Sequence, residues 1–242
     1  RQKAQEAVQV FLNAVSHDLR NPVTGGLMVL KSLQKEAEQQ NGVVAVSSSI
    51  LQRMIQSHDR QLALINSLLE THANEMSGIR LERQAVDLFT LVEQLAIEWQ
   101  PMLEQDESVL QNQVSPNLPL VNADSNQLWR VYENLIANAL KHNPPGITLT
   151  LAAEVEQVPQ STVSMMRCTV QDNGVGIPPE QATSVFELYQ RGAQARRTVG
   201  LGLGLYLCRQ IIVAHGGQIG LTSHPGTGST FWFTLPLFQQ AI

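Results

Sequence analysis

The sequence predicts a helical hairpin followed by a mixed α/β domain. In the first part of the chain, apolar residues recur at alternating gaps of four and three, which is the periodicity of packed helices. Beyond about residue 86, helical patterns alternate with strand-like runs, which is typical of an α/β fold. We therefore expect a helical domain over residues 1–74, a linker over 75–86 and an α/β domain over 87–242.

The chain is long enough to bury two cores, and its charge does not suit nucleic-acid binding. It has 242 residues, of which 43% are hydrophobic, and a formal net charge of −5. Nucleic-acid binding needs basic residues concentrated on one face. Here they are scattered, apart from a short segment at Arg191, Arg196 and Arg197. We expect no nucleic-acid partner.

Cysteine usage and hydropathy indicate a cytoplasmic fragment. Cys168 and Cys208 lie in apolar surroundings and form no disulfide framework, so we expect buried, reduced thiols. No apolar run approaches the roughly 18–20 residues that span a bilayer. Because the chain begins at Arg1, inside a helical pattern, we interpret it as part of a longer protein that could be membrane-anchored elsewhere.

Two helices with wide apolar stripes form the predicted hairpin, and a polar turn over 38–42 separates them. The seam of the first helix, over about 4–38, consists of Val8, Leu12, Val15, Leu19, Gly26, Val29 and Leu33. The seam of the second consists of Leu51, Ile55, His58, Leu62, Ile65, Leu69 and His72. Pairing two hairpins in a dimeric four-helix bundle would cover these stripes. The alternative is that the hairpin packs on the second domain of its own chain.

The second domain alternates helices with strands that are grouped in pairs. This grouping predicts one mixed sheet that helices cover on one face, an α/β sandwich. Helical patterns cover about 87–104, 125–142, 180–188 and 202–215. Strand-like runs cover about 108–114, 146–156, 162–171, 217–223 and 229–237.

His17 lies off the seam of the first helix, so its imidazole is expected to face solvent. It falls between Val15 and Leu19, and Asn21 follows one helical turn later on the same side. A carboxylate that accepts a hydrogen bond from Nδ1–H leaves Nε2 unprotonated and nucleophilic, and Asp18 is adjacent. The arrangement suits an attacking histidine, although a helical His-Asp pair alone specifies no function.

Asn134, Asn138 and Lys141 share one face of a predicted helix, at spacings of four and three. Two carboxamide oxygens beside an ammonium group suit a hydrated Mg²⁺ bound to phosphates, because Mg²⁺ prefers oxygen ligands and keeps part of its water shell. The alternative is an ordinary solvated face.

Three glycine-rich segments follow. Residues 172–178 come after an apolar strand, and the carboxylate of Asp172 could accept a hydrogen bond from an exocyclic amine such as adenine N6. Residues 200–204 open a helix, whose free N–H groups favour phosphate. Residues 226–231 precede the last strand. The second segment is neither a dinucleotide fingerprint nor a Walker loop.

The order and spacing of these segments resemble the H, N, G1, F, G2 and G3 boxes of sensor histidine kinases, over essentially the whole chain. The second domain also resembles the wider ATPase superfamily that includes gyrase, Hsp90 and MutL. The resemblance implies ATP and Mg²⁺ as cofactors, a homodimer, an upstream sensor domain outside this fragment, and a response regulator receiver domain as partner.

The resemblance also implies residue roles. His17 would be the phosphoacceptor and Asp18 its orienting base. Asn21 would position water when the partner is dephosphorylated. Asn134 and Asn138 would hold Mg²⁺. The nucleotide would be bound by Asn134, Asn138, Lys141, His142, Asp172, Gly174, Gly176, Ile177, Arg191, Gly200, Leu201, Gly202, Leu203, Gly204 and Thr230.

Three positions depart from the family pattern. Asp18 stands where glutamate is commoner, and Asn21 where threonine is usual. His142 replaces an aromatic residue, which should weaken stacking on adenine and lower the affinity for ATP.

The function implied is ATP-dependent autophosphorylation of His17, followed by phosphoryl transfer to an aspartate of the receiver domain and joined by phosphatase activity. Two alternatives are a phosphatase-dominant or kinase-dead member and an ATP-driven clamp. Whether transfer runs within or between subunits is left open.

Overall fold

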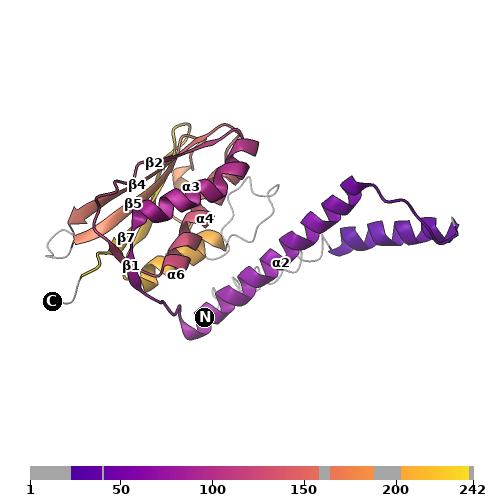
Figure 1. The fold of residues 1–242 in the computed structure, drawn as a ribbon, viewed down its shortest axis with the longest axis horizontal. Coiled ribbons are helices and arrows are strands. Elements are labelled where there is room, and N and C mark those ends of the chain that lie inside the picture. Colours follow the sequence, from indigo (N-terminus) through magenta and orange to yellow (C-terminus); the bar gives the residue numbers. More distant parts are fainter. Residues whose placement is uncertain (1–22, 40, 158–163, 188–202, 240–242) are drawn as a thin grey trace. The chain divides into compact units, whose positions relative to one another are not determined.

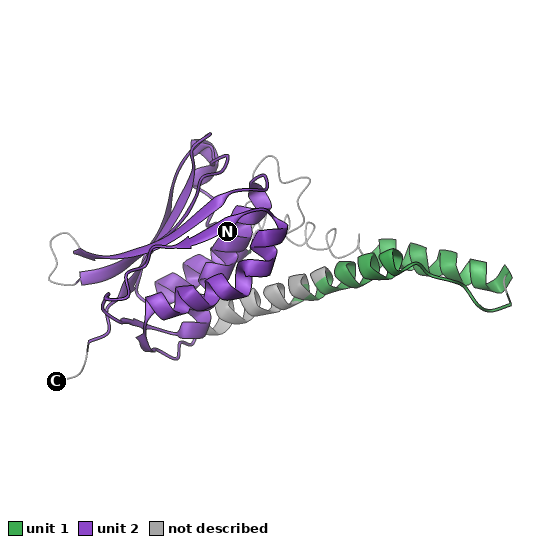
Figure 2. Cartoon of the chain, turned by 45° about the horizontal axis from the view of Figure 1, so that its top comes forward, with its two compact units in different colours: residues 1–76, 193–203 green, residues 77–192, 204–242 purple. Residues whose placement is uncertain are grey.

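The computed structural model describes residues 23–39, 41–157, 164–187 and 203–239. The chain divides into two compact units (Figure 2). One comprises residues 1–76 with 193–203, and the other residues 77–192 with 204–242. The first is helical and the second is α/β, which confirms the predicted fold class.

The described part of the first unit contains a helix over 23–39 and helix α2 (Ser48–Ser77). Between them, Asn41 and Gly42 adopt φ angles of +56° and +84°. Glycine and asparagine tolerate this left-handed region, which commonly ends a helix. The Gly42 N–H donates to the Ala37 carbonyl at 2.8 Å. The predicted turn therefore forms, and α2 continues into the segment expected to be a linker.

The predicted stripe of α2 is exposed in the single chain. The side chains of Leu51, Ile55 and Leu62 are 49%, 61% and 58% exposed. The neighbouring stripe, with Met54 half-buried and Gln61 buried, is the more protected one. An apolar stripe left open on one chain is suited to an interface.

The two helices of this unit approach each other closely at Gly26. Gly26 is buried, and a Cβ atom built there would lie 3.1 Å from His58 Cε1. The His58 ring is itself fixed, because Nδ1 lies 2.8 Å from the Met54 carbonyl oxygen. A glycine inside a helix is unfavourable by itself, and here it makes room for the imidazole.

The second unit is built on a five-stranded sheet in the order β2-β4-β5-β7-β6. The sheet is mixed, because β2 runs parallel to β4 and the other pairs are antiparallel. The strands are β2 (Val109–Asn112), β4 (Thr148–Gln157), β5 (Ser164–Asp172), β6 (Ile219–His224) and β7 (Gly228–Pro236).

Three helices cover one face of this sheet, α3 (Leu88–Gln105), α4 (Ser125–His142) and α6 (Gly204–Ala214) (Figure 1). A fourth, α5 (Pro179–Ala182), is a single turn. The covered face is apolar, as alternation along the strands requires. Tyr132 of α4 meets Phe233 of β7 edge to face, with ring centroids 5.4 Å apart. Cys168 and Cys208 are buried in this core, as predicted, and burial raises the pKa of both thiols to about 12.

Two short strands were not predicted. β1 (Gln84–Val86) and β3 (Val121–Ala123) pair antiparallel in a small second sheet. β1 lies in the segment expected to be a linker. Each strand has three residues, which is too short for an alternating pattern to be visible in the sequence.

The N-terminal end of α4 is fixed by a cluster of hydrogen bonds. Asp124 Oδ1 accepts from the N–H groups of Asn126 and Gln127, which caps the helix. Asp124 Oδ2 accepts from the Glu82 N–H at 2.9 Å, and the Asp124 N–H donates to His215 Nε2 at 2.9 Å. The cluster joins the start of this unit, α4 and the end of α6. Within the part of the chain that the structure describes, no helix is long and apolar enough to cross a membrane.

Candidate active site

The outward face of α4 carries the predicted polar residues. The opposite face is buried through Leu135, Ile136 and Ala139. Asn134 and Asn138 are half-buried and Lys141 is exposed. The asparagines therefore turn away from the core, as their spacing predicts.

The first residue of α6 lies against this face. A Cβ atom built at Gly204 would be 2.8 Å from Asn134 Oδ1. The Asn134 amide nitrogen donates to the Arg130 carbonyl at 2.9 Å, so the Oδ1 atom is turned toward α6. Cys208 Sγ lies 3.8 Å from the Val131 carbonyl oxygen and packs α6 on α4. The N-terminal end of helix α6 thus lies beside the carboxamide oxygen of Asn134, and Gly204 places no side chain between them.

Asp172 ends β5 and is only 4% exposed. Its Oδ1 atom accepts a hydrogen bond from the Gly174 N–H at 2.9 Å. Among the described residues, Oδ2 has no hydrogen-bond partner. This oxygen is therefore available to a hydrogen-bond donor that a ligand could supply.

The loop after Asp172 is held against the turn between β6 and β7. Gly176 adopts a φ of +71°, and a side chain there would overlap with the His224 carbonyl. The Ile177 N–H donates to Ser223 Oγ at 2.7 Å, and the Gly226 N–H donates to the Val175 carbonyl at 2.7 Å. Gly176 is therefore required by both its backbone angle and this close approach.

The structure brings Ser229 rather than Thr230 to the side of Asp172. Ser229 pairs with Asp172 in the sheet and is 5% exposed. Thr230 alternates onto the other face, away from the three helices. Ser229 Oγ lies 3.0 Å from Ser223 Oγ, so both hydroxyls belong to the network beneath the loop. Ser229 is thus the residue of this segment that lies beside Asp172, and the role of Thr230 stays a prediction.

Asn143 and Ser223 are two further residues that the sequence analysis missed. Asn143 Oδ1 accepts from the Val175 N–H at 2.9 Å, and Ser223 Oγ accepts from Ile177 as described. Neither lies inside a glycine segment, and each acts on the loop from another element. A motif search along the chain carries no signal for such contacts.

His142 is exposed at the end of α4. Its pKa is lowered from the usual value by partial burial and by the neighbouring Lys141 ammonium. The ring is therefore neutral at pH 7. Seven predicted site residues lie outside the described part of the chain, namely His17, Asp18, Asn21, Arg191, Gly200, Leu201 and Gly202. Leu203 is described and buried.

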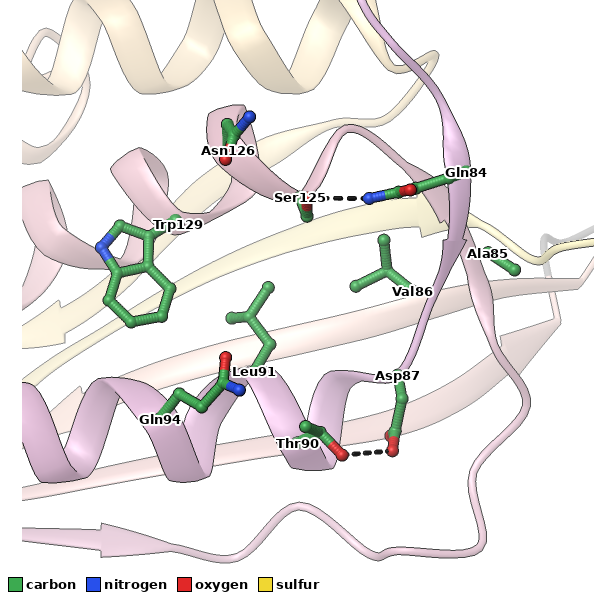
Figure 3. A pocket seen from close by; sticks show the side chains of 10 residues that line it. All are labelled: Gln84, Ala85, Val86, Asp87, Thr90, Leu91, Gln94, Ser125, Asn126 and Trp129. Carbon is green, nitrogen blue, oxygen red and sulfur yellow. Dashed lines mark hydrogen bonds between the residues drawn. The ribbon is translucent and has the colours of Figure 1, made fainter.

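A cavity of this unit lies away from these residues. It has a volume of about 350 Å³ between β1, α3 and the start of α4, and its walls include Val86, Leu91 and Trp129 (Figure 3). Side-chain hydrogen bonds from Gln84 to Ser125 and from Thr90 to Asp87 close parts of its rim. None of the described site residues lines it.

The residues present fit a nucleotide with a divalent cation. Asn134 and Asn138 offer oxygen ligands, which Mg²⁺ accepts together with water and phosphate oxygens. Gly204 leaves room beside Asn134 for such a group, because a Cβ atom would fill that space. Asp172 supplies an acceptor beside the loop that Asn143 holds at the C-terminal end of α4. Asn134, Gly204 and Asp172 thus form a cradle for one elongated ligand with a polar base and phosphates.

The fold and this cradle define an ATPase-type nucleotide-binding domain joined to a helical hairpin. A family described as "Histidine kinase-, DNA gyrase B-, and HSP90-like ATPase" matches residues 123–239, and the "His Kinase A (phospho-acceptor) domain" matches residues 7–75. The chain belongs to the sensor histidine kinases.

Curated relatives agree. The chain is 30% identical to the adaptive-response sensory kinase SasA of Synechococcus elongatus, over 94% of its own length and 59% of the relative's. It is 33% identical to the alginate biosynthesis sensor protein KinB of Pseudomonas aeruginosa, over 98% of its own length and 38% of the relative's. The chain thus spans less than two thirds of these relatives.

Solved histidine kinases share the fold. Full-length ShkA in complex with AMPPNP matches with a TM-score of 0.69 and 26% identity, over 96% of this chain and 46% of that one. ThkA, solved in complex with the response regulator protein TrrA, matches with a TM-score of 0.72 and 19% identity, over 98% of this chain and 64% of that one.

Proposed function

We propose that this chain is a kinase core that transfers the γ-phosphoryl group of ATP to His17. The observation that carries the proposal is the cradle formed by Asn134, Asp172 and Gly204, in a chain whose N-terminal part matches the phosphoacceptor family. ShkA was solved with AMPPNP, an analogue of ATP.

In the proposed reaction, the Nε2 lone pair of His17 attacks the γ-phosphorus and the bond to the β,γ-bridging oxygen breaks, releasing ADP. Asp18 would accept a hydrogen bond from Nδ1–H and so orient the ring. Asp172 would bind the adenine amine, while Lys141 and the N-terminus of α6 would bind phosphate oxygens. Positioning and charge stabilisation provide most of the catalysis in this class of reaction. A Mg²⁺ ion held by Asn134 and Asn138 would neutralise phosphate charge.

The dimer is proposed from the exposed stripe of α2. Leu51, Ile55 and Leu62 lie on one face at helical spacing and are about half exposed or more. The hairpin of a second chain would cover this stripe by forming a four-helix bundle. We place this dimer in the cytoplasm. The linker near 78–83 would let the α/β unit reach His17.

The receiver domain of a response regulator is the proposed partner, as TrrA is for ThkA. The phosphoryl group would pass from His17 to an aspartate of that domain. Asn21, four residues after His17 in the sequence, would position the water that later removes the phosphoryl group.

Labelling with γ-³²P-ATP tests the proposal. We expect the full chain to acquire a label that is stable to base and labile in acid, which is the behaviour of phosphohistidine. His17→Gln should remove the label completely. Steady ATP turnover that is indifferent to His17→Gln would indicate an ATP-driven clamp, and absence of label in the wild type would indicate a kinase-dead member.

A further inference from the structure

Asn143 closes the end of α4 and folds its side chain back on the helix. It is the C-cap residue, and its Nδ2 group donates to the Ala139 carbonyl at 3.0 Å. The last carbonyls of a helix have no partner within the helix, so this bond is favourable by itself. It also fixes the direction in which the carbonyl end of the Asn143 amide points.

That carbonyl end holds the loop after β5. Asn143 Oδ1 accepts the Val175 N–H at 2.9 Å. The amide also packs directly on Gly174, because a Cβ atom built at Gly174 would overlap with the Asn143 amide. Gly174 has no left-handed φ angle, so contact with Asn143 is the reason that a side chain does not fit there.

Gly174 in turn orients Asp172. The Gly174 N–H donates to Asp172 Oδ1 at 2.9 Å, which leaves Oδ2 for a ligand. The position of this N–H depends on the loop backbone. Asn143 fixes that backbone by packing on Gly174 and by accepting the Val175 N–H. A shift of the loop would therefore rotate the carboxylate of Asp172 away from its set direction.

We propose that Asn143 is a positioning residue for adenine recognition, acting through Gly174 and Val175 on Asp172. The inference rests on the proposed function, because it assigns Asp172 to the exocyclic amine of adenine. Asn143 does not touch the nucleotide in this account. Its effect is confined to the base, and binding of the phosphates by the far part of the cradle is independent of it.

Two nucleotides separate this role from a purely structural one. ATP and purine riboside triphosphate differ only in the exocyclic amine that Asp172 would bind. We expect wild-type protein to prefer ATP. In Asn143→Ala, the Kd for ATP should rise about three- to tenfold, the range that one hydrogen bond provides. The Kd for purine riboside triphosphate should change by less than about twofold, so the preference for ATP should disappear.

Asn112→Ala is the matched control. Asn112 also accepts a backbone N–H, from Val114 at 2.9 Å, and donates through Nδ2, to Glu93 Oε1 at 2.7 Å. It lies on β2 and does not contact the loop. This variant should keep the wild-type preference for ATP even where its thermal stability falls as much as that of Asn143→Ala.

The outcomes are distinct. If Asn143→Ala weakens both nucleotides by the same factor, Asn143 is only a helix cap and the inference is overturned, while the proposed function stands. If the wild type itself binds both nucleotides equally, the assignment of Asp172 in the proposed function fails, and the inference fails with it. A loss of preference in Asn143→Ala but not in Asn112→Ala supports it.

Discussion

Polar side chains gather near both ends of helix α4, but they differ in whether their hydrogen bonds are all made within the protein. At the N-terminal end, Asp124, His215, Glu82 and Arg83 form a cluster whose bonds all close within the protein. Both Asp124 oxygens accept backbone N–H groups, and Arg83 Nη2 donates to the Ala214 carbonyl at 2.7 Å. Such a cluster fixes the elements that it joins, and both oxygens of its buried carboxylate are used within the protein.

At the C-terminal end, the polar groups are held in place but not fully used. Asp172 and Asn134 each make a hydrogen bond within the protein through one side-chain atom, and the other side-chain oxygen of each has no hydrogen-bond partner among the described residues. Hydrogen bonds alone therefore do not mark a ligand-binding site. The mark is a polar group that is fixed by one atom and available through another.

The largest effect is expected from Asn138→Ala, at the C-terminal end. It removes one of two proposed metal-ligand oxygens, so labelling by γ-³²P-ATP should fall at least about a hundredfold. The variant should still form dimers in analytical ultracentrifugation, because Asn138 lies outside the hairpin. Labelling at the wild-type rate would contradict the role of this asparagine.

The next largest effect is expected from Asp124→Ala, which disrupts the cluster at the N-terminal end of α4. It removes the helix cap and the bond to Glu82, so the free energy of unfolding should fall by about 2 kcal/mol. Urea denaturation measures the change. Nucleotide affinity at a temperature where the variant is folded should stay within about twofold of wild type. A tenfold loss of ATP affinity would show that the two ends are not separate.

His215 makes the N-terminal cluster sensitive to pH. Its Nδ1–H faces the Ile211 carbonyl at 2.8 Å and its Nε2 accepts from Asp124, so only the neutral ring satisfies both contacts. The pKa of His215 is lowered mainly by burial and further by the nearby positive charge of Arg83. The hydrogen bond to the Ile211 carbonyl and the negative charge of Asp124 oppose this shift only in part.

Because the folded-state pKa lies below the usual value of about 6.5, the unfolded chain binds the proton first. The stabilisation is present above about pH 6.5 and is lost as the pH falls through the folded-state pKa, by up to about 1.4 kcal/mol per pH unit. Urea denaturation of the wild type and of His215→Gln between about pH 7.5 and about pH 5.5 tests this. Equal pH slopes for the two proteins would exclude His215 as the cause.

The smallest effect is expected from His142→Phe. A neutral imidazole offers less stacking surface than a benzene ring, so the substitution should tighten ATP binding about threefold. Isothermal titration gives the affinity, and Thr90→Ala, at the rim of the other cavity, serves as control. Unchanged affinity in His142→Phe would place this side chain away from the base.

Most of the fold followed from patterns within single elements. The bounds of α4 were predicted as 125–142 and are observed as Ser125–His142, because Asp124 caps its start and Asn143-Pro144 ends it. β1 and β3 escaped prediction, since three residues show no period and only their mutual pairing defines them.

The site was predictable where its residues lie in one segment. The spacing of Asn134 and Asn138 and the glycines after Asp172 are visible in the sequence. The place of Ser229 beside Asp172 depends on which face of β7 meets β5 there. The contacts of Asn143 and Ser223 join segments far apart in the chain. Such contacts are set by the fold, so no local pattern carries them.

Amide NMR shifts during a titration with ATP and Mg²⁺ test most directly whether the C-terminal end of α4 is the nucleotide site. We expect the largest shifts at Gly174, Ile177 and Gly204, and unchanged signals for Gln84 and Trp129 at the other cavity. Shifts concentrated at Gln84 and Trp129, or none at all, would contradict this expectation.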